Sequence, residues 1–215
     1  MFDSVSHKTA FIPSLTEDEL ARIAKKYHVE GEQREVFLEV YEALSSSIHT
    51  AASTFLLSEQ RRRVLGLEKR EYYVGMITLG ERVDWQSAFY QEQGLILEAY
   101  MTECLGMELL SNAYEQFDSF VHGLWGQWPG NYVFPGDKYP LSMIKDLIDV
   151  SPDKFITYNE AYALLPSKSV VFLFSLREEK KQACNSLCTA CANKTCENWK
   201  GYGLTYGKQR IFGIK

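Results

Sequence analysis

The run Lys168-Ser-Val-Val-Phe-Leu-Phe-Ser-Leu176 is the stretch of sequence that decides the fold. It is a nearly continuous series of β-branched, aromatic and aliphatic residues, which is typical of a β-strand. Polar residues do not alternate with the apolar ones, so we expect this strand to be central and covered on both faces. A second strand is predicted for Glu71-Tyr-Tyr-Val-Gly-Met-Ile-Thr-Leu79, which is β-rich and ends at Gly80.

Helices are predicted for much of the rest of the chain. Thr16-Glu-Asp-Glu19 has the capping-box pattern, so a helix is expected from there to about Tyr27. Further helices are expected from near Gln33 to Phe55, from a cap at Asp84, from Leu95 to about Trp125 after an interruption at Gly94, and from Leu141 to Ile148. The serines at 45–47 are expected to weaken the second helix without ending it. Residues 155–157 are strand-like, and residues 159–164 fit either a strand or a helical turn.

The order of these elements, helices first and then mixed strands and helices, predicts an α+β fold. We divide the chain into an N-terminal helical segment (1–70) packed on the main domain, an α+β core (71–180) and a cysteine-rich tail (181–215). The stretch 128–140 holds three of the six prolines and is expected to be an ordered, irregular loop. Aromatic-rich loops of this length are often functional.

Composition excludes several classes of function. The net charge of −5 gives no basic surface for nucleic acid. The first residues lack the apolar segment of a secretory signal, and no apolar run approaches the ~20 residues that a membrane span needs. We therefore expect a cytoplasmic protein that binds neither nucleic acid nor membrane.

Four of the five cysteines lie close together, as Cys184-x3-Cys188-x2-Cys191-x4-Cys196. Thiolates this close in sequence can converge on one soft metal, and four of them suit an iron–sulfur cluster or a zinc ion. The spacing matches neither a zinc ribbon nor a standard ferredoxin. The alternatives are idle thiols or disulfides, and disulfides are disfavoured in the cytoplasm. Cys104 lies on an apolar helix face and is expected in the core.

Three blocks of sequence together resemble the reactivation domain of vitamin B12-dependent methionine synthase, here in a stand-alone form with a C-terminal cysteine motif. The blocks are Met76-Ile-Thr-Leu-Gly-Glu-Arg-Val-Asp84, the helical run Gly94 to Glu108, and the series Pro135-Gly136, Tyr139-Pro-Leu141, Ile156-Thr157 and Leu165-Pro-Ser-Lys-Ser-Val170. They cover residues 70–176, and their order and spacing carry the resemblance. It implies a twisted, mainly antiparallel sheet flanked by helices, a groove for S-adenosylmethionine, and a partner that carries cobalamin.

The resemblance also implies a ligand site. The family's adenosylmethionine motif runs Arg, three residues, Gly-Tyr, and the matching run here is Tyr132-Val-Phe-Pro-Gly136-Asp137. A phenol in place of the Arg cannot pair bidentately with the ligand's carboxylate. Asp137 would repel that carboxylate but attract the sulfonium. The expected ligand-binding residues are Glu103, Tyr132, Pro135, Gly136, Asp137 and Tyr139.

Two of these assignments have alternatives. Pro135-Gly136 is explained equally by a turn whose glycine has a positive φ. Glu103 is an acid on a mostly apolar helix, where burial is costly unless the charge is paired. It is expected either to hold a ligand's amino group or hydroxyls, or to lie on the helix's exposed edge.

The leading hypothesis is an accessory protein that docks on a corrinoid-binding protein or B12-dependent methyltransferase. It would help return Co(II) to the methylated or Co(I) state, as a methyltransferase activation component whose own enzymatic activity and catalytic residues stay unassigned. The chemistry would rest on the cobalamin. One alternative is an iron–sulfur electron-transfer protein without adenosylmethionine, and another is a zinc-stapled binding module without catalysis.

Overall fold

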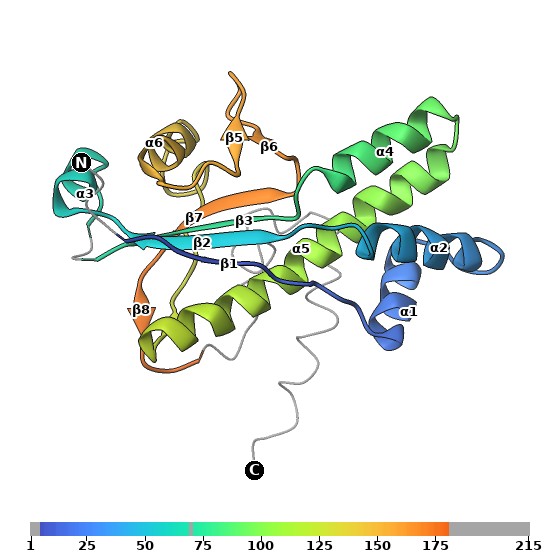
Figure 1. Cartoon of the computed structure of the whole chain (residues 1–215), viewed down its shortest axis with the longest axis horizontal. Helices are drawn as coiled ribbons and strands as arrows, with labels where there is room; N and C mark the ends of the chain where they lie inside the picture. The colour runs from blue at the N-terminus through green and yellow to red at the C-terminus, as the bar shows by residue number, and fades with distance from the viewer. Residues whose placement is uncertain (1–4, 69–70, 181–215) are drawn as a thin grey trace, which may run out of the picture.

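A four-stranded antiparallel sheet forms the centre of the molecule. The structure, a computed structural model, describes residues 5–68 and 71–180. The strands, in the order in which they lie in the sheet, are β1 (His7–Thr9), β2 (Ala51–Leu56), β3 (Tyr73–Thr78) and β7 (Ser169–Phe174). The expectation of an α+β fold with a mainly antiparallel sheet flanked by helices is confirmed (Figure 1).

Helices cover both faces of this sheet. One face carries α1 (Glu17–Lys26), α2 (Gln33–Ser45), α4 (Arg82–Glu92) and the long α5 (Ile96–Trp125). The other face carries α6 (Met143–Val150) and the small hairpin of β5 (Thr157–Tyr158) and β6 (Leu164–Leu165). The short helix α3 (Glu59–Val64) connects β2 to β3 and lies at one end of the sheet (Figure 1). No described helix is both long and apolar enough to cross a membrane.

Strands β3 and β7 pair along their whole length and separate the two cores. Every residue of β7 is buried, as expected for a strand that is covered on both faces. Val170, Phe172 and Phe174 face α5, whereas Val171 and Leu173 face α6. Because side chains alternate along a strand, this one apolar run supplies both cores at once.

The outer edge of β7 is also covered. Residues 128–133 run antiparallel along it, with β4 (Trp128–Pro129) paired to β8 (Leu176–Arg177) and Val133 bridged to Leu173. The Gly130 amide donates to the Ser175 carbonyl at 2.7 Å. β7 is therefore the last strand of the four-stranded sheet and not the central one that was expected from its apolar run. Both of its faces are buried, and Leu173 has a backbone partner, Val133, on its outer side.

Several local predictions are confirmed. Thr16 and Glu19 form the capping box of α1, with the Thr16 amide 2.8 Å from a Glu19 carboxylate oxygen. Gly94, at a φ of 75°, separates α4 from α5, and α5 spans nearly the predicted range. Cys104 is 6 % exposed, as expected for a core residue, and burial raises the pKa of its thiol.

The predicted helix from Gln33 to Phe55 is wrong beyond Ser45. The hydroxyls of Ser46 and Ser47 donate to the Ala43 carbonyl at 3.2 and 2.8 Å, which takes up an acceptor that a continuing helix would use. The chain then turns and enters the sheet as β2. The first 70 residues thus provide helices α1 and α2, as expected, and also two strands of the sheet.

Smaller differences concern the ends of elements. Asp84 does not cap α4, because the helix begins at Arg82 with Glu81 at its N-cap, and Asp84 lies in the first turn. The short helix α6 begins two residues later than expected. Residues 157–158 and 164–165 form a two-stranded hairpin, so the strand reading of the second segment holds only at its end.

A buried carboxylate ties β1 to the loop after α6. Asp153 is 1 % exposed; its carboxylate accepts from the Ser6 hydroxyl at 2.5 Å and pairs with the Lys8 ammonium. Burial by itself would raise the pKa of this carboxyl. Hydrogen bonds from Lys8, Ser6 and Ser53 outweigh that effect and hold the pKa below its usual value.

Gly75→Ala is expected to destabilise the protein by about 1–3 kcal/mol, because the site is overpacked by a methyl group. A Cβ at position 75 would lie 2.4 Å from Phe172 Cε2 and 3.0 Å from Phe117 Cζ. Urea denaturation followed by circular dichroism measures the effect. Gly123→Ala is the control: nothing lies within 4 Å of its Cβ position in α5, so that variant should gain about 0.5–1 kcal/mol. Equal effects of the two substitutions would contradict the packing argument.

Lys8→Met is expected to lower the free energy of unfolding by about 1–2 kcal/mol at pH 7, because it removes a charged hydrogen bond from a buried carboxylate. The folded-state pKa of Asp153 lies below its unfolded value of about 3.9. Its contribution is therefore full above that pH and is lost as the pH falls through the folded pKa. Urea titrations of both proteins at neutral and acidic pH should show the difference shrinking in acid. A difference that does not change with pH would show that Asp153 is not responsible.

Candidate functional site

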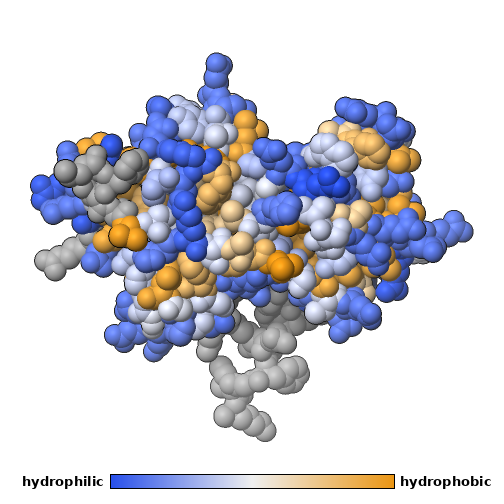
Figure 2. Space-filling model, in the orientation of Figure 1, coloured by the Kyte–Doolittle hydropathy of each residue, from blue (hydrophilic) through white to orange (hydrophobic). Residues whose placement is uncertain are grey.

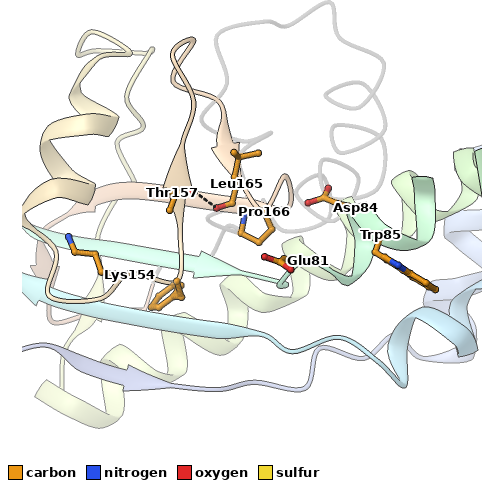
Figure 3. A pocket seen from close by; sticks show the side chains of 8 residues that line it. Glu81, Asp84, Trp85, Lys154, Thr157, Leu165 and Pro166 are labelled. Atoms are coloured by element: carbon orange, nitrogen blue, oxygen red, sulfur yellow. Dashed lines mark hydrogen bonds between the residues drawn. The ribbon is translucent and has the colours of Figure 1, made fainter. Parts of the chain in front are cut away.

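An open cleft of about 440 Å³ lies where β3 leads into α4 and where β6 leads into β7 (Figure 3). This volume is within the range of small-ligand pockets. Two walls enclose it, one from the start of α4 and one from the loop and hairpin that precede β7. The lining residues are Glu81, Asp84, Trp85, Lys154, Phe155, Thr157, Leu165 and Pro166.

The α4 wall is positioned by the end of the sheet. The Leu79 amide donates to the Lys168 carbonyl at 3.0 Å, which continues the β3–β7 ladder by one bond. Gly80 then turns the chain with a φ of 77°. A Cβ at this position would lie only 3.0 Å from the His49 carbonyl oxygen. Helix α4 follows directly, so Glu81 is brought to the edge of the cleft.

The opposite wall is the β5–β6 hairpin and the loop before it. The Asn159 side-chain oxygen accepts from the amides of Ala161 and Ala163 at 2.9 and 3.0 Å and closes the hairpin turn. The Lys154 ammonium donates to the carbonyls of Ile148 and Asp149 at 3.1 and 3.4 Å, at the end of α6. The ammonium of this lysine is thus bonded at the helix end, and Lys154 is one of the lining residues of the cleft.

Two polar contacts fasten the walls to each other and to α5. An Asp84 carboxylate oxygen accepts from the Ser167 amide at 2.8 Å. The next residue, Lys168, donates to Glu103 at 2.5 Å. A Cβ on Gly106 would lie 3.1 Å from Lys168 Cε, so this glycine gives the lysine room to cross α5. The side chain of Lys168 is 9 % exposed and that of Glu103 is 44 % exposed.

The charge inside the cleft is negative. Neither Glu81 nor Asp84 forms an ion pair with any described residue. The neighbouring Arg82 points elsewhere: its Nε donates to the Ser47 hydroxyl at 3.0 Å, and its guanidinium lies 4.2 Å from the Trp85 ring centroid. The cleft therefore combines two carboxylates that are not ion-paired with apolar surface, which suits a cationic group that has an apolar body.

The residues predicted to bind adenosylmethionine lie elsewhere. Tyr132 is 4 % exposed and belongs to the aromatic core, with its ring 4.1 Å from that of Phe172. Its hydroxyl donates to the Asp118 carboxylate of α5. Asp118 is fifteen residues beyond Glu103 on α5, about 22 Å further along the helix axis. Glu103 and Tyr132 are therefore not brought into one site.

Pro135 to Tyr139 form a tight turn. Gly136 has a φ of 93°, and its amide donates to the Tyr139 carbonyl at 2.8 Å. The turn that was weighed as an alternative is thus present, with Asp137 exposed on it. The Tyr139 hydroxyl faces that of Tyr72, whose pKa is raised by burial and by this hydrogen bond. Pro135, Gly136, Asp137 and Tyr139 are therefore close together, at a place other than the cleft.

The metal site predicted at Cys184, Cys188, Cys191 and Cys196 lies outside the described residues. Within residues 5–68 and 71–180, no group of three or more His, Cys, Asp or Glu side chains is placed to hold a metal ion.

Sequence reasoning missed the cleft. Glu81 and Trp85 follow a predicted strand and its Gly80 turn, which is a recognisable signal for residues at the end of a sheet. Nothing in the sequence indicated that this turn lies beside Phe155 and Leu165. These residues are some 75 to 85 positions away along the chain and come together only through the β3–β7 register.

Comparison with known proteins supports the fold. No family model matches the chain, and no curated protein matches it. Among solved structures, the chain is similar to the MetH reactivation domain bound to AdoHcy, with a TM-score of 0.54 and 11 % sequence identity. The similarity covers 85 % of this chain and 81 % of that one. At this identity the likeness is one of fold, so the chain has the architecture of a MetH reactivation domain.

Glu103→Gln is expected to destabilise the protein by about 1–3 kcal/mol, because it leaves a nearly buried ammonium without its charged partner. Thermal and urea unfolding measure the change. Glu98→Gln is the matched control, since it lies on the same helix and its side chain forms no ion pair with a described residue. If both variants unfold alike, the Lys168–Glu103 contact does not contribute to stability.

Proposed function

We propose that the chain is an accessory protein for a cobalamin-dependent methyltransferase, and that it takes part in the reductive reactivation or methylation of the corrinoid and binds S-adenosylmethionine. The observation that carries the proposal is the similarity in fold, over 85 % of the chain, to a reactivation domain with AdoHcy bound. The resemblance in sequence blocks along residues 70–176 supports it independently.

The ligand would bind at the turn from Pro135 to Tyr139, beside the outer edge of β7. Three features of that turn support this placement. It is exposed at Asp137, its glycine leaves the backbone accessible, and Asp137 forms no ion pair with a described residue. A carboxylate in that position attracts a sulfonium or an amino group. Tyr132 would act through packing, because its hydroxyl is already bonded to Asp118.

The partner's cobalamin would supply the redox and methyl-transfer chemistry. The residues of this chain would bind and orient the methyl donor. Neutral AdoHcy lacks the sulfonium charge, so Asp137 would contribute less to its binding than to that of S-adenosylmethionine.

The cysteine motif favours a second candidate function. Four thiolates within thirteen residues, Cys184 to Cys196, would hold an iron–sulfur cluster that delivers electrons to the corrinoid, or a structural zinc. Anaerobic purification distinguishes the two. A brown protein with visible charge-transfer absorbance contradicts zinc, and a colourless protein with stoichiometric zinc contradicts electron transfer.

Calorimetric titration tests the leading proposal. Wild-type protein should bind S-adenosylmethionine, and Asp137→Asn should weaken that binding about 10- to 30-fold through loss of a charged partner. AdoHcy should show a smaller effect of the substitution. Asp146→Asn, an exposed acid on α6, is the control and should bind like wild type. If neither ligand binds the wild-type protein at millimolar concentration, the methyl-donor role is excluded.

A further inference from the structure

Helix α4 carries an exposed stack of three side chains beside the cleft. The rings of Trp85 and Phe89 are parallel within 8°, with centroids 5.5 Å apart, and the Arg82 guanidinium lies 4.2 Å from the Trp85 centroid. Trp85 is 53 % exposed and Phe89 is 43 % exposed. On the other lip of the cleft, Leu165 is 48 % exposed. Large apolar side chains are thus exposed on both sides of one cleft.

This stack is held in place before any partner binds. Arg82 is fixed at its Nε by the Ser47 hydroxyl, and Trp85 is flanked by Arg82 and by Phe89. Trp and Arg are the residue types most enriched among the side chains that dominate protein–protein binding. An ordered, exposed group of this kind loses little conformational entropy on binding.

The surface is too open for an enclosed small-molecule site. Five of the eight lining residues are exposed (Glu81, Trp85, Lys154, Thr157 and Leu165), whereas small-ligand pockets cover most of their ligand. Hydrophobic residues also lie on the surface of the α4–α5 hairpin, at the right of Figure 2, where Phe89, Leu95 and Ile96 are exposed. The cleft is therefore continuous with a surface that suits a macromolecule.

Charge determines what kind of segment fits. Glu81 and Asp84 have no ion-pair partner among the described residues. Lys154, which lines the cleft, donates to carbonyls at the end of α6, and Arg82 donates to Ser47. A bound segment should therefore bring its own cation to this wall. An apolar neighbour of that cation would pack between Trp85 and Leu165.

We propose that this cleft and the Arg82–Trp85–Phe89 stack form a docking surface for a protein segment that presents a lysine or arginine beside an apolar side chain. We assign this segment to the corrinoid-carrying protein, and that assignment rests on the proposed function. The chemical character of the surface itself does not depend on the proposed function. The occupants that compete with it are a free organic cation and a second copy of this chain.

A designed peptide tests the chemistry without any assumption about the partner. The probe is N-acetyl-Gly-Leu-Lys-Leu-Gly-amide, titrated into 15N-labelled protein, with the amide and indole signals of Trp85 as the readout. We expect a Kd on the order of 1 mM, as for a short fragment of an interface. The same peptide with acetyl-lysine should bind at least about tenfold more weakly, because it lacks the charge.

The double variant Glu81→Gln/Asp84→Asn should bind the peptide about tenfold more weakly. It should keep its fold, because the side-chain amide oxygen introduced at position 84 can still accept from the Ser167 amide. Glu92→Gln/Glu98→Gln removes the same charge from the α4–α5 hairpin and should bind like wild type. Equal binding of the lysine and acetyl-lysine peptides, or signal changes away from α4, would overturn the proposal. Two other results would also overturn it. One is lysine amide binding as tightly as the peptide, which indicates a site for a free organic cation; the other is a dimer of this chain that Trp85→Ala dissociates.

A second arm uses a corrinoid-carrying methyltransferase protein as the partner. Trp85→Ala should raise its Kd about 30-fold and leave the affinity for S-adenosylmethionine unchanged. Partner binding that is unaffected by Trp85→Ala overturns this docking surface. If the peptide binds and S-adenosylmethionine does not, the docking surface is supported and the methyl-donor role is excluded. If S-adenosylmethionine binds and the peptide does not, the methyl-donor role is supported and the docking surface is excluded.

Discussion

Strand β7 pairs with β3 along its full length while both of its faces are buried. Gly75 of β3 lacks a Cβ, which allows side chains to pack closely on the face toward α5. Phe172 and Phe117 pack over this glycine at distances that leave no room for a Cβ. On the opposite face, Val171 and Leu173 form part of the core with α6. The two cores therefore share the β3–β7 strand pair. The positions of the helices packed on either face depend on the register between these two strands.

The same register builds the cleft. The ladder ends at the Leu79 amide and the Lys168 carbonyl, and from that point the chain leaves the sheet toward α4 on one side and arrives from β6 on the other. Asp84 and Glu103 then hold Ser167 and Lys168 against α4 and α5. The cleft is thus fastened to the end of the β3–β7 ladder, and the strands of that ladder are buried.

The residues expected to bind the ligand differ in burial: Tyr132 is buried and Asp137 is exposed. Tyr132 is part of a cluster of aromatic rings, and its hydroxyl donates to the Asp118 carboxylate. The turn from Pro135 to Tyr139 carries two exposed charged residues: Asp137, which has no ion pair with a described residue, and Lys138, which pairs with Glu68. A ligand at this loop would be recognised chiefly through its cation.

The sequence by itself determined the α+β class, the capped start of α1, the break at Gly94 and the doubly covered strand β7. Each of these follows from local propensity or from the pattern of apolar residues, and such effects act over a few neighbouring positions. The apolar pattern gave a wrong prediction at 46–56. There the helix ends at the three serines and the chain continues as a strand whose partners lie elsewhere in the sequence. Only the tertiary structure decided that Tyr132 is buried, that Glu103 pairs with Lys168, and that Glu81, Trp85 and Leu165 surround one cleft. These contacts join residues brought together by sheet register, which no local pattern encodes.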